Sequence, residues 1–102
     1  MTGRNRLPNR RPAENFEIEV EGLRYTATVG RFPDGTIGEL FLSHRSNSSA
    51  DTTARDSAIV LSIALQHGAD LEAIQRALCR DSQGHASGPL GAALDIIMGR
   101  TA

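Results

Sequence analysis

The sequence predicts an α+β domain in which a three-stranded antiparallel sheet is covered by three C-terminal helices, in the order βββααα. Two observations predict it. Apolar and polar residues alternate with a period of two in the first part of the chain, and apolar residues recur at helical spacing in the second. The 102 residues suffice for one domain, and with 39% hydrophobic but only 4% aromatic residues the core must be mainly aliphatic.

Three strands are predicted between residues 16 and 42. In the first, apolar side chains alternate with glutamates, at Phe16, Ile18 and Val20. The Glu21-Gly22 turn then leads into a second strand, 23–29, and closes a hairpin that sets Arg24 beside the glutamates. A turn over 33–36 leads into the third strand, Ile37–Leu42. This strand has apolar residues on both faces, so we expect it to be central or covered by a helix.

Three helices are predicted in the rest of the chain. The first begins near Ala54, after a polar loop over 43–53 in which each of residues 51–53 can serve as the cap. It is apolar around most of its circumference, so we expect burial on most sides, with a face shared in a homodimer as the alternative. Asp70 caps the second helix, and the third begins at Pro89.

The charge is unevenly distributed along the chain. The net charge is −1, but residues 1–12 contain four arginines and no acid, so this segment carries +4 and the remainder −5. Residues 1–15 have few apolar side chains, so we expect a flexible basic arm followed by a single domain over 16–102. A polyanion would meet the arm at Arg4, Arg6, Arg10 and Arg11.

A second candidate binding site is the polar loop that runs into the first predicted helix. Backbone amides at a helix start, hydroxyl groups and guanidinium groups are what a phosphate oxygen needs. The site consists of Arg45, Ser46, Asn47, Ser48, Ser49, Thr52, Thr53 and Arg55. An ordinary capped and solvated loop is the alternative, and Asp51 and Asp56 add negative charge beside it.

No group of residues in the sequence has the spacing of a catalytic, metal-binding or cofactor-binding site. Cys79, expected on the second helix, has no second ligand at metal-binding spacing, and neither His67 nor His85 supplies one. We therefore expect a protein that is not an enzyme and that binds neither metal nor cofactor. No apolar run is long enough to span a membrane and the N-terminus lacks the apolar core of a secretion signal, so a cytoplasmic location is expected.

Four segments form a recognisable pattern in a fixed order. They are Leu7-Pro8-Asn9-Arg10-Arg11, then Tyr25 to Gly30 followed by Asp34-Gly35, then Gly38-Glu39-Leu40-Phe41-Leu42, and finally Ser62-Ile63-Ala64-Leu65-Gln66-His67-Gly68 followed by Leu71. In this order and spacing they resemble the C-terminal region of adenosylcobalamin-dependent (class II) ribonucleotide reductases and the small stand-alone proteins with the same TSCPD-type domain. The resemblance runs over most of the chain, from Arg6 to Ile97.

The resemblance implies a detached domain without reductase chemistry of its own. In those reductases the radical chemistry, the cobalamin and the catalytic cysteines belong to a barrel domain that this sequence does not contain. The motif that names the domain has a cysteine beside a proline before the last helix, whereas the matching stretch here reads Ser87-Gly88-Pro89-Leu90-Gly91. The thiol on which a metal or redox role would depend is therefore missing.

Three functions agree with these observations. The leading hypothesis is a non-catalytic binding module that recognises a macromolecular partner, either protein or nucleic acid, through the basic arm and the polar loop. The second is an accessory or regulatory protein of nucleotide metabolism that binds a nucleotide or phosphate at the loop between Arg45 and Arg55. The third is a small mobile-element protein that inhibits a host nucleoprotein complex.

Overall fold

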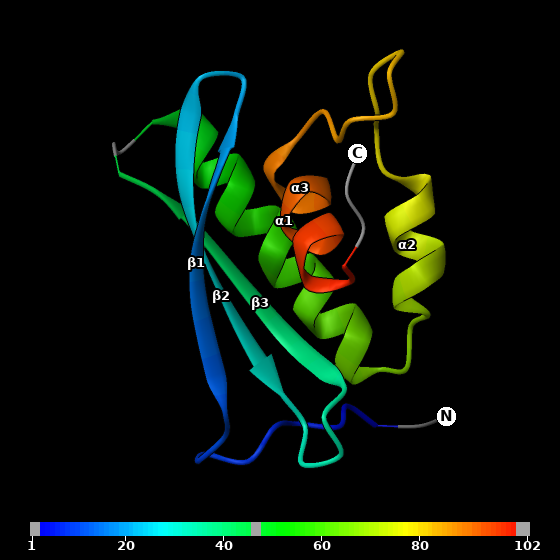
Figure 1. The fold of residues 1–102 in the computed structure, drawn as a ribbon. Helices are drawn as coiled ribbons and strands as arrows, with labels where there is room; N and C mark the ends of the chain where they lie inside the picture. The colour runs from blue at the N-terminus through cyan, green and yellow to red at the C-terminus, as the bar shows by residue number, and fades with distance from the viewer. Residues whose placement is uncertain (1–2, 46–47, 100–102) are drawn as a thin grey trace.

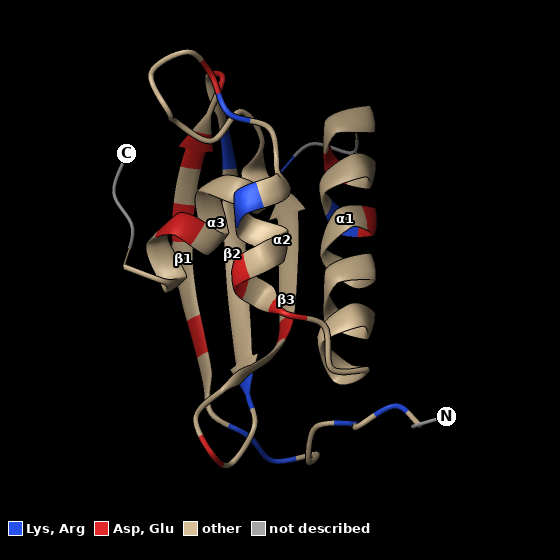
Figure 2. Ribbon diagram, turned by 90° about the vertical axis from the view of Figure 1, so that its right-hand side faces the viewer, with Lys and Arg blue, Asp and Glu red and all other residues tan. Residues whose placement is uncertain are grey.

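The computed structural model describes residues 3–45 and 48–99 and has the predicted α+β fold (Figure 1). The elements are β1 (Ala13–Val20), β2 (Leu23–Arg31), β3 (Ile37–His44), α1 (Ser49–Gln66), α2 (Leu71–Ala77) and α3 (Pro89–Ile97). The strands form an antiparallel sheet in the order β1-β2-β3. All three helices lie on the same side of this sheet, with α2 outermost, so the opposite face of the sheet has no helix over it (Figures 1 and 2).

The β1–β2 hairpin forms as predicted. Its turn residues Glu21 and Gly22 both have positive φ, 53° and 76°. Two consecutive residues in the left-handed region make the type I′ turn, whose twist matches that of the two strands. The register pairs Glu19 with Arg24, and the Arg24 guanidinium lies 3.8 Å from the Glu17 carboxylate.

The start of β1 differs from the prediction. The strand begins at Ala13 rather than Phe16, so residues 13–15 belong to the sheet and not to the basic arm predicted over 1–15. The period-two pattern of apolar residues begins only at Phe16, because the side chains before it lie at the solvated end of the strand. Pairing of the backbone nevertheless continues to Ala13, which lies opposite Gly30.

The core lies between the sheet and the helices and is largely aliphatic. Its buried side chains are Ile18, Val20, Tyr25, Ala27, Val29, Leu40 and Leu42 from the sheet, Ala54, Ala58, Leu61 and Leu65 from α1, and Ala93 and Leu94 from α3. The strand residues follow the period of two and the helix residues follow helical spacing, as the sequence predicts. No helix within the described residues is long and apolar enough to cross a membrane.

α1 also covers the outer edge of β3. Three polar side chains of the helix contact backbone groups of the strand that β2 does not pair. The Ser62 hydroxyl accepts a hydrogen bond from the Leu40 N–H (2.8 Å), the Gln66 amide donates to the Gly38 carbonyl (2.9 Å), and the Asp51 carboxylate accepts from the His44 N–H (2.7 Å). Unpaired groups at a sheet edge pair readily with other chains, so a helix that satisfies them closes the edge.

This arrangement predicts a difference between two serines of the same helix. We expect Ser62→Ala to lower the free energy of unfolding by about 1 to 3 kcal/mol, because it leaves the buried Leu40 N–H without its partner. Ser57→Ala should have almost no effect, since the Ser57 hydroxyl only adds a bond to the Ala54 carbonyl of its own helix. Urea denaturation of both variants checks this. Equal losses of stability would show that the edge contact contributes nothing.

α1 is less buried than the sequence predicts. Its start lies at Ser49, not near Ala54, because Ser48 is the N-cap. Ile59, Val60 and Ile63 are 49%, 67% and 40% exposed, which corrects the expectation of burial on most sides. The helix lies beside the edge strand β3, so only one of its faces meets the core (Figure 2). These three exposed residues are where the interface of the predicted homodimer would lie. The homodimer itself stays a prediction.

Candidate functional site

The uncovered face of the sheet presents its side chains in rows that cross the three strands. The register sets Asn15 of β1, Thr28 of β2 and Phe41 of β3 in one row, and Glu17, Thr26 and Ser43 in the next. These positions alternate with buried residues such as Leu40 and Leu42. They therefore point away from the core.

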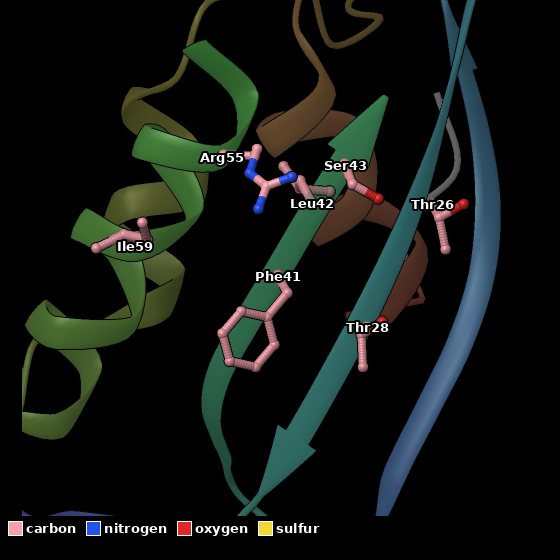
Figure 3. Close-up of a pocket in the computed structure, with 7 residues that line it drawn as sticks. All are labelled: Thr26, Thr28, Phe41, Leu42, Ser43, Arg55 and Ile59. Carbon is pink, nitrogen blue, oxygen red and sulfur yellow. The ribbon is translucent and has the colours of Figure 1, made fainter. Parts of the chain in front are cut away.

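Two hollows meet on the β2–β3 part of this face. The first has a volume of about 470 Å³ and is lined by Thr26, Thr28, Phe41, Leu42, Ser43, Arg55 and Ile59 (Figure 3). The second has a volume of about 400 Å³ and is lined by Glu17, Arg24, Thr26, Ser43, His44 and Arg45. They share Thr26 and Ser43, so they form one continuous depression, which we call the sheet groove.

The centre of the sheet groove is apolar and its surroundings are polar. Phe41 is 47% exposed and lies opposite Thr28. Across the groove α1 contributes Ile59 and Arg55, and Figure 3 shows the Arg55 guanidinium reaching toward β3 beside Leu42. The groove thus offers a flat ring, an aliphatic wall and several hydrogen-bonding groups to a bound molecule.

The charges around the sheet groove are arranged by element. Arg55 extends from α1, and its side chain is 62% exposed although it lies 3.8 Å from Asp51. Arg45 follows β3 and is exposed, whereas β1 carries glutamates along its length (Figure 2). Both side chains of the Arg24–Glu17 ion pair are exposed, so this pair contributes little to the stability of the fold. Among the charged residues that line the groove, Arg55 and Arg45 therefore lie toward α1 and Glu17 toward β1, while Asp51 and Asp56 of α1 flank Arg55 without lining the groove.

The predicted anion site at the helix start is distributed differently from the expectation. Ser49, Thr52 and Thr53 lie within α1 and are exposed. The first turn of this helix already holds a negative charge, the buried Asp51 carboxylate, which accepts a hydrogen bond from the His44 N–H and lies 3.8 Å from Arg55. Arg45 and Arg55 line different halves of the sheet groove. Ser46 and Asn47 lie outside the described residues.

The predicted basic arm contacts the domain. The Asn5 N–H donates to the Gln66 carbonyl (2.7 Å) and the Arg4 side chain donates to the Gln66 amide oxygen (2.5 Å). Arg11 forms an ion pair with Glu39, whose side chain is only 10% exposed. Arg6 and Arg10 are exposed. Two of the four arm arginines are thus engaged with the domain and two are available to a partner.

The segments that carry the family resemblance converge where the arm docks. A Cβ atom added to Gly38 would lie 2.9 Å from the Leu7 side chain and 2.7 Å from the Phe32 ring, so Leu7 packs where the strand has no side chain. The Glu39 carboxylate that binds Arg11 lies over Gly30 in the same way. The segments that carry the resemblance therefore contact one another in the structure, although they are separate in the sequence.

Cys79 lies away from the sheet groove. Cys79 is exposed and lies just after α2. The prediction that Cys79 is part of this helix is wrong: α2 ends at Ala77, because the backbone of Leu78 is already extended (φ −72°, ψ 154°). Within the described residues no three His, Cys, Asp or Glu side chains are grouped so that they could hold a metal ion. In the loop after Cys79, a hydrogen bond from the His85 N–H lowers the pKa of Asp81 below its ordinary value.

Of the main groove residues, the sequence pattern predicts only Arg45 and Arg55. The pattern gives the others, Phe41, Thr26, Thr28 and Ile59, positions in strands or in a buried helix and no binding role. One signal in the sequence points to the groove: Phe41 interrupts the polar side of the third strand. The pattern favours burial of this side under a helix, whereas the helices cover only the other face of the sheet.

No protein-family model and no solved structure matches the chain. The chain is similar to vitamin B12-dependent ribonucleotide reductases: it is 36% identical over 70 residues to the protein of Agrobacterium fabrum, 36% over 72 residues to that of Rhodopirellula baltica, and 29% over 73 residues to that of Bradyrhizobium diazoefficiens.

The matches cover 68%, 70% and 71% of this chain but only 6%, 7% and 6% of the relatives. The chain therefore belongs to the class of small α+β domains and is similar to a short region of much larger proteins. More particularly, the predicted resemblance to the adenosylcobalamin-dependent ribonucleotide reductases is confirmed.

Proposed function

We propose that the chain is a non-catalytic binding module whose macromolecular partner docks on the sheet groove. The observation that carries the proposal is the exposed ring of Phe41, which lies in the groove on the β3 part of a sheet face that no helix covers (Figures 1 and 3). Large apolar side chains on an open face, bordered by polar groups, mark interaction sites. Arg45 and Arg55 at the groove, together with the exposed Arg6 and Arg10 of the arm, favour an anionic partner.

The chemistry of the groove supports binding rather than catalysis. Among its lining residues the titratable groups other than arginine are Glu17 and His44. The Nδ1 atom of His44 lies 2.8 Å from the Arg24 carbonyl oxygen, and the His44 ring packs at 5.2 Å from that of Tyr25. A nucleophile held by a general base is the arrangement that covalent catalysis needs, and these residues do not supply it. We expect the module to act in the cytoplasm.

A second candidate function is an accessory role in nucleotide metabolism. It is favoured by the similarity to ribonucleotide reductases, although the chain spans only 6% to 7% of their length. A free nucleotide or phosphate would then bind between Arg45 and Arg55. This function predicts saturable binding of mononucleotides, which a module for macromolecules does not require.

Photo-crosslinking tests the proposed function. A photoreactive phenylalanine analogue at Thr28, inside the groove, is expected to give a covalent adduct with a macromolecule in a lysate of the native host. The same analogue at Glu72 of α2, on the helix side, should give none. Introducing Phe41→Glu should reduce the Thr28 adduct at least tenfold, while Ile96→Glu, at an exposed position of α3, should not. Adducts of equal yield from both positions would refute the proposal.

A further inference from the structure

We infer that the partner of the sheet groove is single-stranded nucleic acid, with one base stacked on Phe41 and the adjoining phosphates bound by Arg55 and Arg45. The inference rests on the proposed function and specifies its partner. It follows from three features of the groove: the position of the aromatic ring, the placement of the guanidinium groups, and the acidic boundary along β1.

Phe41 has the surroundings of a stacking platform. Its ring stands on the uncovered face with Thr28 opposite it and is 47% exposed, and Figure 3 shows it free of the neighbouring labelled side chains. The short Thr28 side chain leaves space over β2 for a planar group. Nucleic-acid-binding sheets use exposed aromatic rings in this way, because every base has a π face and stacks without regard to sequence.

The arginines lie where phosphates next to such a base would be. Arg55 reaches from α1 toward β3 on the same hollow as Phe41 (Figure 3), and Arg45 lies at the adjoining hollow beyond Ser43. Arg55 remains 62% exposed beside Asp51, and the pair spans 3.8 Å. A phosphate therefore displaces only a weak contact and forms a charge-assisted bond with the guanidinium.

The acidic residues of β1 restrict the path of the bound nucleic-acid strand over the sheet. Glu17 and Glu19 lie on the β1 side of the same face, where they repel phosphates, so we expect the backbone to follow β3 and α1. On that side the Glu39 carboxylate is paired with Arg11 and the Asp51 carboxylate is buried, and Asp56 is the exposed acid next to Arg55. A base inside a duplex cannot offer its face to a ring that lies flat on a sheet, so the groove selects single strands. An acidic peptide could bind the arginines but would make no use of a planar ring.

Fluorescence anisotropy with a labelled oligothymidylate of about twelve nucleotides tests the inference on the full chain. We expect Phe41→Ala and Phe41→Leu each to weaken binding roughly tenfold and Phe41→Trp to bind at least as tightly as the parent. Arg55→Gln should reduce the slope of log affinity against log salt, measured between about 50 and 200 mM, by about 0.7. Arg76→Gln on α2 and Ile96→Ala on α3 are the matched controls and should leave binding unchanged. Thermal midpoints establish that all variants fold.

Three results would overturn the inference. These are no binding of the oligonucleotide by the parent in the micromolar range, equal affinity for the duplex form, and retention of binding by Phe41→Leu. The last would mean that the contact is hydrophobic rather than stacked. If any of them occurs while the Thr28 adduct proves to be a protein, the proposed binding module stands and only its nucleic-acid partner is wrong. If no adduct forms either, both proposals fail.

Discussion

Replacing Arg11 by alanine is expected to lower the free energy of unfolding by about 3 kcal/mol, because it leaves the Glu39 carboxylate without its cation. The Glu39 side chain is 10% exposed and that of Arg11 28%, so water replaces the lost partner only in part. For a domain of this size the loss corresponds to a fall in the thermal midpoint of more than about 10 °C. Thermal unfolding followed by circular dichroism measures it.

The arm provides its own control. Arg10 precedes Arg11 and is exposed, so Arg10→Ala changes the net charge equally and should leave the midpoint within about one degree. The double variant of Arg11→Ala with Glu39→Gln should recover part of the stability, because a neutral amide costs less to bury than a carboxylate. Equal midpoints for the two single variants would show that the arm does not stabilise the domain.

The second large effect is expected for Gly30→Ala. A Cβ atom at position 30 would lie 2.6 Å from Cγ and 2.8 Å from Cδ of Glu39, distances that no relaxed structure allows. We expect the flexible Glu39 side chain to move away and to lose its pair with Arg11, so the free energy of unfolding should fall by up to about 3 kcal/mol, mainly from the broken pair.

Urea denaturation measures the effect of Gly30→Ala, with Gly3→Ala as the control, since nothing lies within 4 Å of a Cβ atom at Gly3. Combining Gly30→Ala with Glu39→Ala should cost less than the two single losses together, because the clash disappears with the carboxylate. If the loss in the double variant equals the sum of the two single losses, the side chain of Glu39 does not lie against Gly30 as it does in the structure.

The order of the elements and the core-facing sides of β1 and β2 could be predicted because they depend on local patterns. Alternation from Phe16 onward fixes the sides of these two strands that meet the core, and Pro89 marks the start of α3. The start of α1 could not be placed, since several hydroxyl and acidic residues compete as caps over 48–53 and only tertiary contacts of Asp51 decide between them. Local preference alone does not distinguish such candidates.

The docking of the arm and the exposure of α1 depend on contacts that are distant in sequence. Charge and low apolar content predict a free arm, whereas in the structure Arg11 of the arm pairs with the buried carboxylate of Glu39. The apolar girth of α1 suggested burial, yet Val60 is 67% exposed. In the same way charge and position in a polar loop identify Arg45 and Arg55 as candidates, whereas the exposure of Phe41 depends on the open face of the sheet, which only the tertiary structure shows.

The side chains of α1 that bond to β3 also determine where this sheet can grow. With one edge occupied by Ser62 and its neighbours, any assembly that adds a strand has to use β1, whose outer side pairs with no other described strand. Two copies joined antiparallel through β1 would bring Glu17 and Glu19 of each chain close to those of the other, and like charges oppose such pairing. We therefore expect both edges of the sheet to disfavour the addition of strands from further copies of the chain, while the face between the edges stays accessible.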